Sequence, residues 1–179
     1  PVFLLKQDEW NTMASSIVRK PYVLFFCVGY NDELDQTLEF AKNLANEKNM
    51  ELLYLSNQDI WYKHRELHHC GAASPCEFLG YIRNASYVVT NSFHGCALGI
   101  IYNKKIFSLE EKRFIGDQRY KAMLGKASVY NKIVPYDTDW SVFNFEDHII
   151  DGSIVYKNLT SWIEESKSYL NESISLCRR

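Results

Sequence analysis

The pattern that most constrains the fold is an apolar strand followed by an amphipathic helix and a second strand. Residues Tyr22–Val28 are apolar or aromatic throughout and stand between a proline and a glycine, which predicts a buried strand. Asn31 or Asp32 can cap the helix that follows, and Met50–Leu55 predicts the next strand. The helix has an apolar stripe at helical spacing, formed by Leu34, Leu38, Ala41 and Ala45. Two strands joined by such a helix are typical of a right-handed parallel crossover.

The alternation of helices and strands continues to the end of the chain. Residues Ser74–Glu77 read Ser-Pro-Cys-Glu, a capping box with proline at the first helical position, so a helix should begin there and reach Asn84. The other expected elements are, in chain order, a helix at Lys6–Ile17 with Trp10 and Met13 inward, a strand at Tyr87–Thr90, a helix at Gly95–Tyr102, a strand at Ile106–Leu109, a helix at Gln118–Leu124, a strand at Lys132–Val134 and an amphipathic helix at Leu159–Cys177. This order predicts an α/β fold, with an open, mostly parallel, Rossmann-like sheet and helices on both faces, formed by residues 1–179 as a single domain.

Composition narrows the functional classes. The 179 residues carry a formal net charge of −2, and this balance argues against a nucleic-acid partner. The longest apolar run is far shorter than the roughly 20 residues that span a bilayer, so we expect no transmembrane segment, while peripheral membrane contact stays open. Five scattered cysteines are no disulfide framework, which favours the cytoplasm, with the inner face of the membrane as the alternative. Because the chain starts at Pro1 rather than at methionine, we expect an amino-terminal domain to precede it in a longer protein.

The segment after the third predicted strand is the strongest candidate for a site. In open parallel sheets ligands bind beyond the carboxyl ends of the strands. Asn91, Ser92 and Gly95 stand where this strand ends and a helix begins, so backbone N–H groups there suit a phosphate or a carboxylate. His94 would lie beside that anion as a charge partner or general acid, since an imidazole exchanges its proton near neutral pH. The alternative is structural, with Ser92 capping the helix and His94 packing against the preceding phenylalanine.

A basic group follows the next strand. Lys112 and Arg113 lie in the loop and Arg119 lies in the following helix, so each could bind an anion at the same edge of the sheet. The loop also contains Glu110 and Glu111, which could pair with these cations or, in a nucleotide-using fold, bind ribose hydroxyls. The single glycine after the first strand is weak evidence for a nucleotide.

The remaining candidates have a structural interpretation. Five side chains gather without the paired spacing of a structural zinc site: His64, His68, His69, Cys70 and Cys76. We therefore expect no metal site and no cofactor. Cys96 closely follows His94, but it stands in an apolar helix and should be a buried core residue rather than a nucleophile.

Residues 74–95 combine the capping box, a helix that ends in Asn84-Ala85, a short strand and the sequence Ser-Phe-His-Gly before an apolar helix. This combination resembles the polysaccharide pyruvyl transferase family. The opening Pro1–Leu5 is similar to the family's interdomain segment, and the tail at Leu159–Leu176 resembles its closing helix. The likeness covers nearly the whole chain, as the carboxyl-terminal half of a typical member. Residues 103–105 depart from the family, which usually has a proline after the apolar helix.

The resemblance implies a two-domain architecture like that of GT-B glycosyltransferases, with the active site between the domains. It also implies transfer of a pyruvyl group from phosphoenolpyruvate to a sugar hydroxyl pair, which forms a ketal in a surface polysaccharide. By resemblance, His94 matches the active-site histidine, and Lys112 or Arg113 matches the basic residue that faces the donor. Arg119 matches a frequent arginine at the start of the following helix. Two alternatives stay open: a glycosyltransferase half that uses a nucleotide sugar, with Glu110 or Glu111 on the ribose, and a non-catalytic family member.

Residues 1–179 alone should have no transferase activity, because half of the expected cleft lies in the amino-terminal part. A turnover assay with phosphoenolpyruvate and a saccharide acceptor checks this expectation, and turnover by these residues alone would contradict it.

Overall fold

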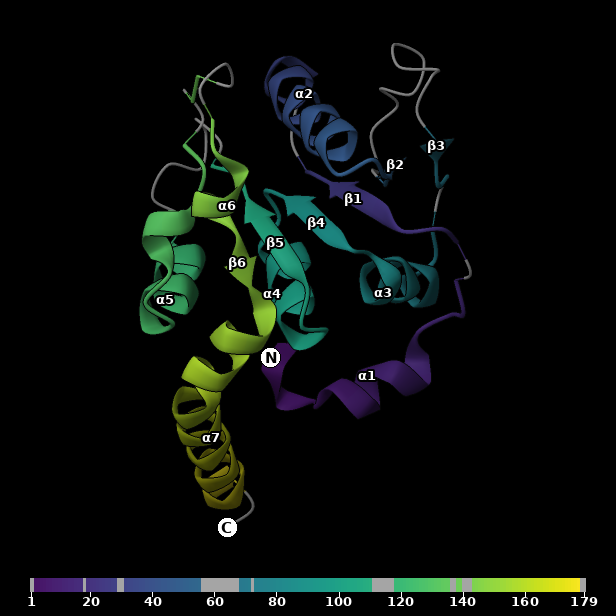
Figure 1. The fold of residues 1–179 in the computed structure, drawn as a ribbon. Helices are drawn as coiled ribbons and strands as arrows, with labels where there is room; N and C mark the ends of the chain where they lie inside the picture. The colour runs from purple at the N-terminus through teal and green to yellow at the C-terminus, as the bar shows by residue number, and fades with distance from the viewer. Residues whose placement is uncertain are drawn as a thin grey trace.

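A computed structural model describes residues 2–17, 19–28, 31–55, 68–71, 73–110, 118–135, 138–139 and 143–177. One six-stranded sheet runs through them in the order β3-β2-β1-β4-β5-β6 (Figure 1). Its strands are β1 Tyr22–Phe26, β2 Glu51–Tyr54, β3 His68–His69, β4 Tyr87–Thr90, β5 Lys105–Ser108 and β6 Ile150–Asp151. Neighbouring strands from β3 to β5 are parallel, whereas β6 is antiparallel to β5. The expected α/β fold with an open, mostly parallel, Rossmann-like sheet is confirmed.

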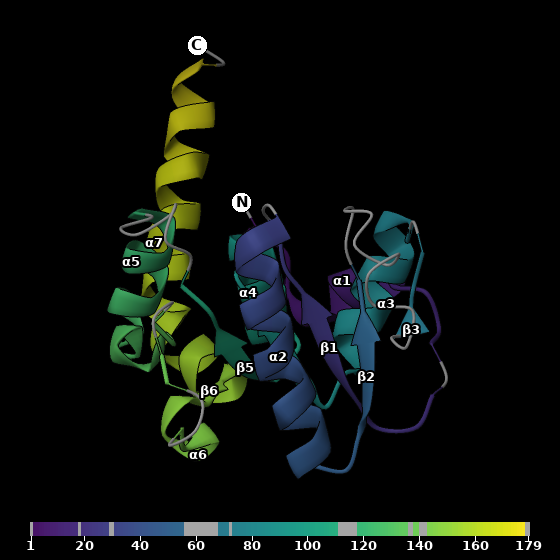
Figure 2. The same ribbon diagram turned by 90° about the horizontal axis from the view of Figure 1, so that it is seen from above.

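Helices cover both faces of the sheet, with α2 on one face and α3 and α4 on the other (Figures 1 and 2). The α-helices are α1 Gln7–Met13, α2 Asn31–Glu47, α3 Pro75–Asn84, α4 Phe93–Ile101, α5 Gln118–Lys126, α6 Phe145–His148 and α7 Gly152–Cys177, and short 3-10 helices lie at Val2–Leu4 and Tyr130–Lys132. Because side chains alternate along a strand, β1 contributes side chains to the core on each face of the sheet. Val23 and Phe25 pack in the core beside α2, and Leu24 packs in the core beside α4. The strand is therefore buried on both faces, as its apolar run predicts.

Helix α3 begins and ends where its sequence signals predict, whereas α1 ends at Met13 instead of Ile17 and the expected caps Asn31 and Asp32 lie inside α2. The Ser74 hydroxyl accepts a hydrogen bond from the Glu77 N–H at 3.3 Å, and the Glu77 carboxylate accepts one from the Ser74 N–H at 2.9 Å. This reciprocal cap starts α3 at Pro75. In α2 the predicted stripe is buried at Leu38, Ala41 and Ala45, and the side chain of Leu34 lies outside the described residues.

The expected strand at Lys132–Val134 is wrong. A 3-10 turn occupies Tyr130–Lys132. In the described part of this segment, Val134 forms a single isolated parallel bridge with Leu109. Strands β3 and β6 were not expected from the sequence. Each contains two residues, which is too short for an alternating pattern to show.

The expected inward position of Met13 is also wrong, because Met13 ends α1 and its side chain is 40% exposed. The expected inward position of Trp10 is confirmed. Trp10 is half-buried, packs against the core and donates its indole N–H to the Val2 carbonyl at 3.2 Å.

Helix α7 begins at Gly152 rather than at Leu159. Its first half packs on the fold through the buried side chains Leu159 and Ile163. The same apolar stripe is exposed further along, at 40% for Leu170 and 44% for Ile174, because the second half of α7 runs beyond the sheet and its covering helices (Figure 2). None of the helices that the structure describes is both long and apolar enough to cross a bilayer.

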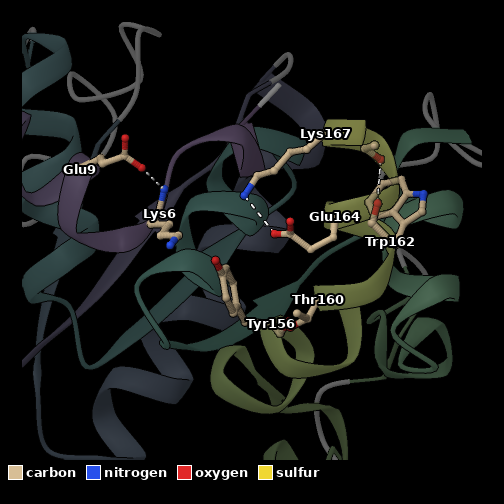
Figure 3. Close-up of polar contacts among 8 residues, drawn as sticks. Lys6, Glu9, Tyr156, Thr160, Trp162, Glu164 and Lys167 are labelled. Atoms are coloured by element: carbon tan, nitrogen blue, oxygen red, sulfur yellow. Dashed lines mark hydrogen bonds and ion pairs between the residues drawn. The ribbon is translucent and has the colours of Figure 1, made fainter. Parts of the chain in front are cut away.

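The amino-terminal segment packs along α7. The rings of Phe3 and Tyr156 lie with their centroids 6.4 Å apart. Figure 3 shows Lys6, at the start of α1, and Tyr156 reaching toward one another. Beside them, the Lys6 backbone N–H donates to the Glu9 carboxylate at 2.8 Å. The residues before α1 are therefore a packed part of the fold.

The turn after α4 brings three elements into close contact. Asn103 adopts a left-handed conformation with φ 55°, and the Lys104 N–H donates to the Gly99 carbonyl at 2.9 Å, as in a Schellman cap. The Gly152 N–H in turn donates to the Lys104 carbonyl at 2.8 Å. A Cβ on Gly152 would lie 2.9 Å from the Gly99 oxygen and from two backbone atoms of Lys104. Only glycine allows α7 to start this close to the turn.

Gly152→Ala should lower the free energy of unfolding by about 2–3 kcal/mol, because the new methyl group meets backbone that cannot move aside. Chemical denaturation measures the change. The matched control is Gly125→Ala in α5, where no atom lies within 4 Å of the added Cβ. That variant should raise the free energy of unfolding by about 0.5–1 kcal/mol, since alanine favours a helix interior over glycine. Equal effects of the two substitutions would contradict the packing argument.

Candidate functional site

The candidate site lies at the carboxyl ends of β1 and β4, which are neighbours in the sheet. From β1 the chain continues to β2 on one side, and from β4 it continues to β5 on the other side. This is the topological switch point of the sheet, beyond which open α/β folds bind their ligands. Figure 1 shows α4 starting from this end of β4.

Asn91 joins the two strand ends across the switch point. Its side-chain oxygen accepts a hydrogen bond from the Val28 N–H at 2.7 Å, and its side-chain nitrogen donates to the Val28 carbonyl at 2.7 Å. Asn91 is 8% exposed, so both bonds lie in a largely buried position. The Asn91 side-chain amide therefore holds the chain that follows β1. Contact of Asn91 with a substrate stays a prediction.

Ser92 and Gly95 set the start of α4. The Ser92 hydroxyl accepts the Gly95 N–H at 3.4 Å, and the Ser92 N–H donates to the buried Thr90 hydroxyl at 3.0 Å. A Cβ on Gly95 would lie 2.5 Å from that Thr90 oxygen and 2.9 Å from the Phe26 ring, so glycine lets the helix lie directly on the strands. Both residues thus have structural roles, and substrate binding by either stays a prediction. Among the described residues no acceptor is found for the neighbouring His94 N–H.

His94 and Arg119 each lie against the Phe93 ring at this helix start. The His94 side chain is exposed, and its ring lies edge-on to the Phe93 ring with the centroids 5.6 Å apart. The guanidinium carbon of Arg119, from the first turn of α5, lies 5.4 Å from the Phe93 ring centroid. Two of the predicted site residues are therefore brought to the same aromatic ring. The arrangement combines a proton-exchanging group with a cation, and it suits an anionic ligand.

The loop after β5 contains the other predicted cations. Lys112 and Arg113 lie outside the described residues, as does Glu111. Glu110 is half-buried directly after β5, and its backbone N–H donates to the Val134 carbonyl at 2.8 Å. That bond fixes the point at which the loop leaves the sheet.

The cysteine and histidine candidates do not assemble a second site within the described ranges. Burial raises the pKa of the Cys96 thiol to about 12, and the neighbouring Ser108 hydroxyl lowers it only in part, so a thiolate nucleophile is not available. Burial also raises the pKa of the half-buried Cys70, while Cys76 is exposed. His64 and the side chains of His68 and His69 lie outside the description. In the part of the chain that is described, no three side chains of the metal-binding types form a group.

Two features of the site were missed from the sequence. One is the paired hydrogen bond of Asn91 with Val28, which joins residues far apart in the chain and has no local signal. The other is the contact of Phe93 with Arg119. The sequence signal for this contact is an aromatic residue next to the candidate histidine, together with a basic residue early in a following helix.

The open, mostly parallel sheet with helices on both faces defines a Rossmann-like protein. Comparison with known families identifies the family, because the family model described as polysaccharide pyruvyl transferase matches residues 1–113. The chain belongs to that family, so the expected family is confirmed, while the likeness of the tail at Leu159–Leu176 lies beyond the matched residues and stays a prediction. No curated protein and no solved structure matches the chain. The matched range contains His94, Lys112 and Arg113, whereas Arg119 lies beyond it.

Asn91→Ala should lower the free energy of unfolding by about 2 kcal/mol, because the Val28 N–H and carbonyl would both lose their partner. Chemical denaturation measures this loss. The control is Asn158→Ala, which removes one bond, from the Asn158 side chain to the Ala127 carbonyl at 3.2 Å, at an exposed position. A loss for Asn91→Ala no larger than that of the control would contradict the bridging role.

Proposed function

We propose that this chain is the donor-binding part of a polysaccharide pyruvyl transferase, which moves a pyruvyl group from phosphoenolpyruvate to a pair of sugar hydroxyls. Family membership supports a transferase with a saccharide acceptor. The observation that supports the donor assignment is that the exposed His94 ring and the Arg119 guanidinium both lie against the Phe93 ring at the start of α4. A helix start favours negative charge, and a guanidinium can bind a carboxylate or phosphate through two N–H groups.

Phosphoenolpyruvate has two anionic groups, a phosphate and a carboxylate, so its site needs several positive groups. In this proposal Arg119 holds one of them, and Lys112 or Arg113 from the loop after β5 holds the other. The N–H groups at the start of α4 add partial positive charge near His94. Positive charge at the phosphate also assists its departure, because negative charge grows on the leaving oxygen.

The reaction forms two carbon–oxygen bonds and breaks one. A proton adds to the methylene carbon of the donor, which becomes a methyl group, and the first sugar hydroxyl adds to the electron-poor carbon beside it. The bond from that carbon to the phosphate oxygen then breaks, and the second hydroxyl adds to close the ketal. The two sugar hydroxyls together release two protons. One replaces the proton added to the methylene carbon, and the other leaves on inorganic phosphate.

His94 is the group that we assign to proton transfer in this scheme. Its ring is exposed at the helix start, where it can give a proton to the methylene carbon and recover one from a sugar hydroxyl. The Phe93 ring lies beside it, with the two ring centroids 5.6 Å apart. The acceptor would bind on the opposite side of the donor, against a domain that precedes residue 1. We propose that the whole enzyme works in the cytoplasm or at the inner face of the membrane.

His94→Gln should reduce turnover of phosphoenolpyruvate by about 10²- to 10⁴-fold, the range that a positioned general acid–base contributes. Its affinity for phosphoenolpyruvate should change by less than about 10-fold, because glutamine keeps a hydrogen-bond donor at the site. Calorimetric titration and release of inorganic phosphate measure the two quantities in the intact protein. The control is His148→Gln, whose ring stacks on Phe143 with centroids 4.8 Å apart, beside the α2 core.

Unchanged turnover in His94→Gln would contradict the catalytic assignment. Competition by a nucleoside diphosphate, with none by phosphoenolpyruvate, would replace the proposal with a glycosyltransferase that uses a nucleotide sugar.

A further inference from the structure

We propose that Phe93 is a positioning residue, which holds the Arg119 guanidinium beside His94 so that both groups face one anionic substrate group. This inference rests on the proposed function, since it takes the anion to be part of the donor. Phe93 is not assigned a contact with substrate. It acts through the arginine that lies over its ring.

The fold determines where the Phe93 ring lies. Phe93 is the first residue of α4, directly after the Ser92 cap. Its side chain is half-buried and packs against the core that lies between α4 and the sheet. Gly95 brings this turn of the helix close to Thr90 and Phe26, so the helix start has little room to shift. The ring is therefore a fixed surface at the edge of the site.

The Phe93 ring restricts the Arg119 side chain. It is an exposed residue in the first turn of α5, and a long arginine side chain on a helix surface has many rotamers. Its guanidinium carbon lies 5.4 Å from the Phe93 centroid, within the range of a cation–π contact. A guanidinium stacked on a ring can still bind a carboxylate or phosphate through its edge, because its N–H groups lie in its own plane.

The same ring lies next to the histidine ring but is not assigned a role in orienting it. The Phe93 and His94 rings meet nearly at right angles, with an interplanar angle of 79°. One aromatic side chain thus contacts the cation on its face and the neighbouring imidazole edge-on. Replacing Phe93 by an aliphatic residue removes the surface for Arg119 and leaves the cap and the helix start in place.

A double-mutant cycle tests the proposal in the intact protein, using Phe93→Leu, Arg119→Gln and the two together. Phe93→Leu should raise the KM for phosphoenolpyruvate about 3- to 5-fold with kcat nearly unchanged, as expected for loss of one cation–π contact. Arg119→Gln should raise that KM about 10-fold or more. If Phe93 acts through Arg119, adding Phe93→Leu to Arg119→Gln should change nothing further. Phe93→Tyr keeps the ring face and should behave like the unmodified protein.

The matched control is Phe3→Leu. Phe3 is also half-buried and packed against the same core, but its ring contacts Tyr156 of α7 rather than an arginine. This variant should lose comparable stability and keep the KM. Independent effects of Phe93→Leu and Arg119→Gln, multiplying in the double variant, would overturn the proposal.

An NMR measurement separates this inference from the proposed function. The Nε–Hε resonance of Arg119 in the unliganded protein should carry a ring-current shift that Phe93→Leu removes and Phe93→Tyr keeps. An unchanged resonance in Phe93→Leu would overturn the positioning role, whatever the donor is. If the resonance shifts as expected but phosphoenolpyruvate does not bind the unmodified protein, the donor assignment fails and the role of Phe93 as the support for Arg119 stands.

Discussion

The site depends on the hydrogen-bonded pairing of the Asn91 side chain with the Val28 backbone. The connections of the two parallel strands β1 and β4 lead away in opposite directions at this point, and the two bonds hold Val28, two residues beyond β1, to the residue that follows β4. The carboxamide supplies both a donor and an acceptor, with each bond at 2.7 Å. An aspartate in its ionised form lacks the donor, and a leucine lacks both groups. The end of β1 and the start of α4 are thereby held in one arrangement.

The position of the helix follows from that anchor. Thr90 accepts the Ser92 N–H, Ser92 caps the helix, and Gly95 lets its first turn rest on the strands. These residues lie close together in the chain. The hydroxyl groups of Thr90 and Ser92 and the absence of a side chain at Gly95 bring α4 near the sheet. His94 is the residue of this segment that points to solvent. Structural contacts thus occupy its neighbours, while the His94 side chain is exposed.

Much of the fold is predictable from local patterns, whereas the contacts that build the site are not. The apolar run of β1, the cap of α3 and the stripe of α2 are each encoded within a few residues, and the structure has them as expected. The two-residue strands and the single bridge of Val134 depend on partners distant in the chain, so no window of sequence reveals them.

The same distinction applies to the site and to α7. The segment around His94 was identifiable because a strand end and a helix cap are local signals. The meeting of Arg119 with Phe93 depends on how α5 returns to the sheet. In α7 an apolar stripe predicts a buried face along the whole helix, but Tyr169 is 73% exposed, because burial also needs a neighbour that reaches that far.

The central claim is that His94 and Arg119 share one anionic ligand at the start of α4. A crystal structure of the intact protein with phosphoenolpyruvate tests it most directly. The account predicts a phosphate or carboxylate oxygen within hydrogen-bonding distance of both the His94 ring and the Arg119 guanidinium. A donor bound elsewhere, with neither side chain in contact with it, would contradict the account.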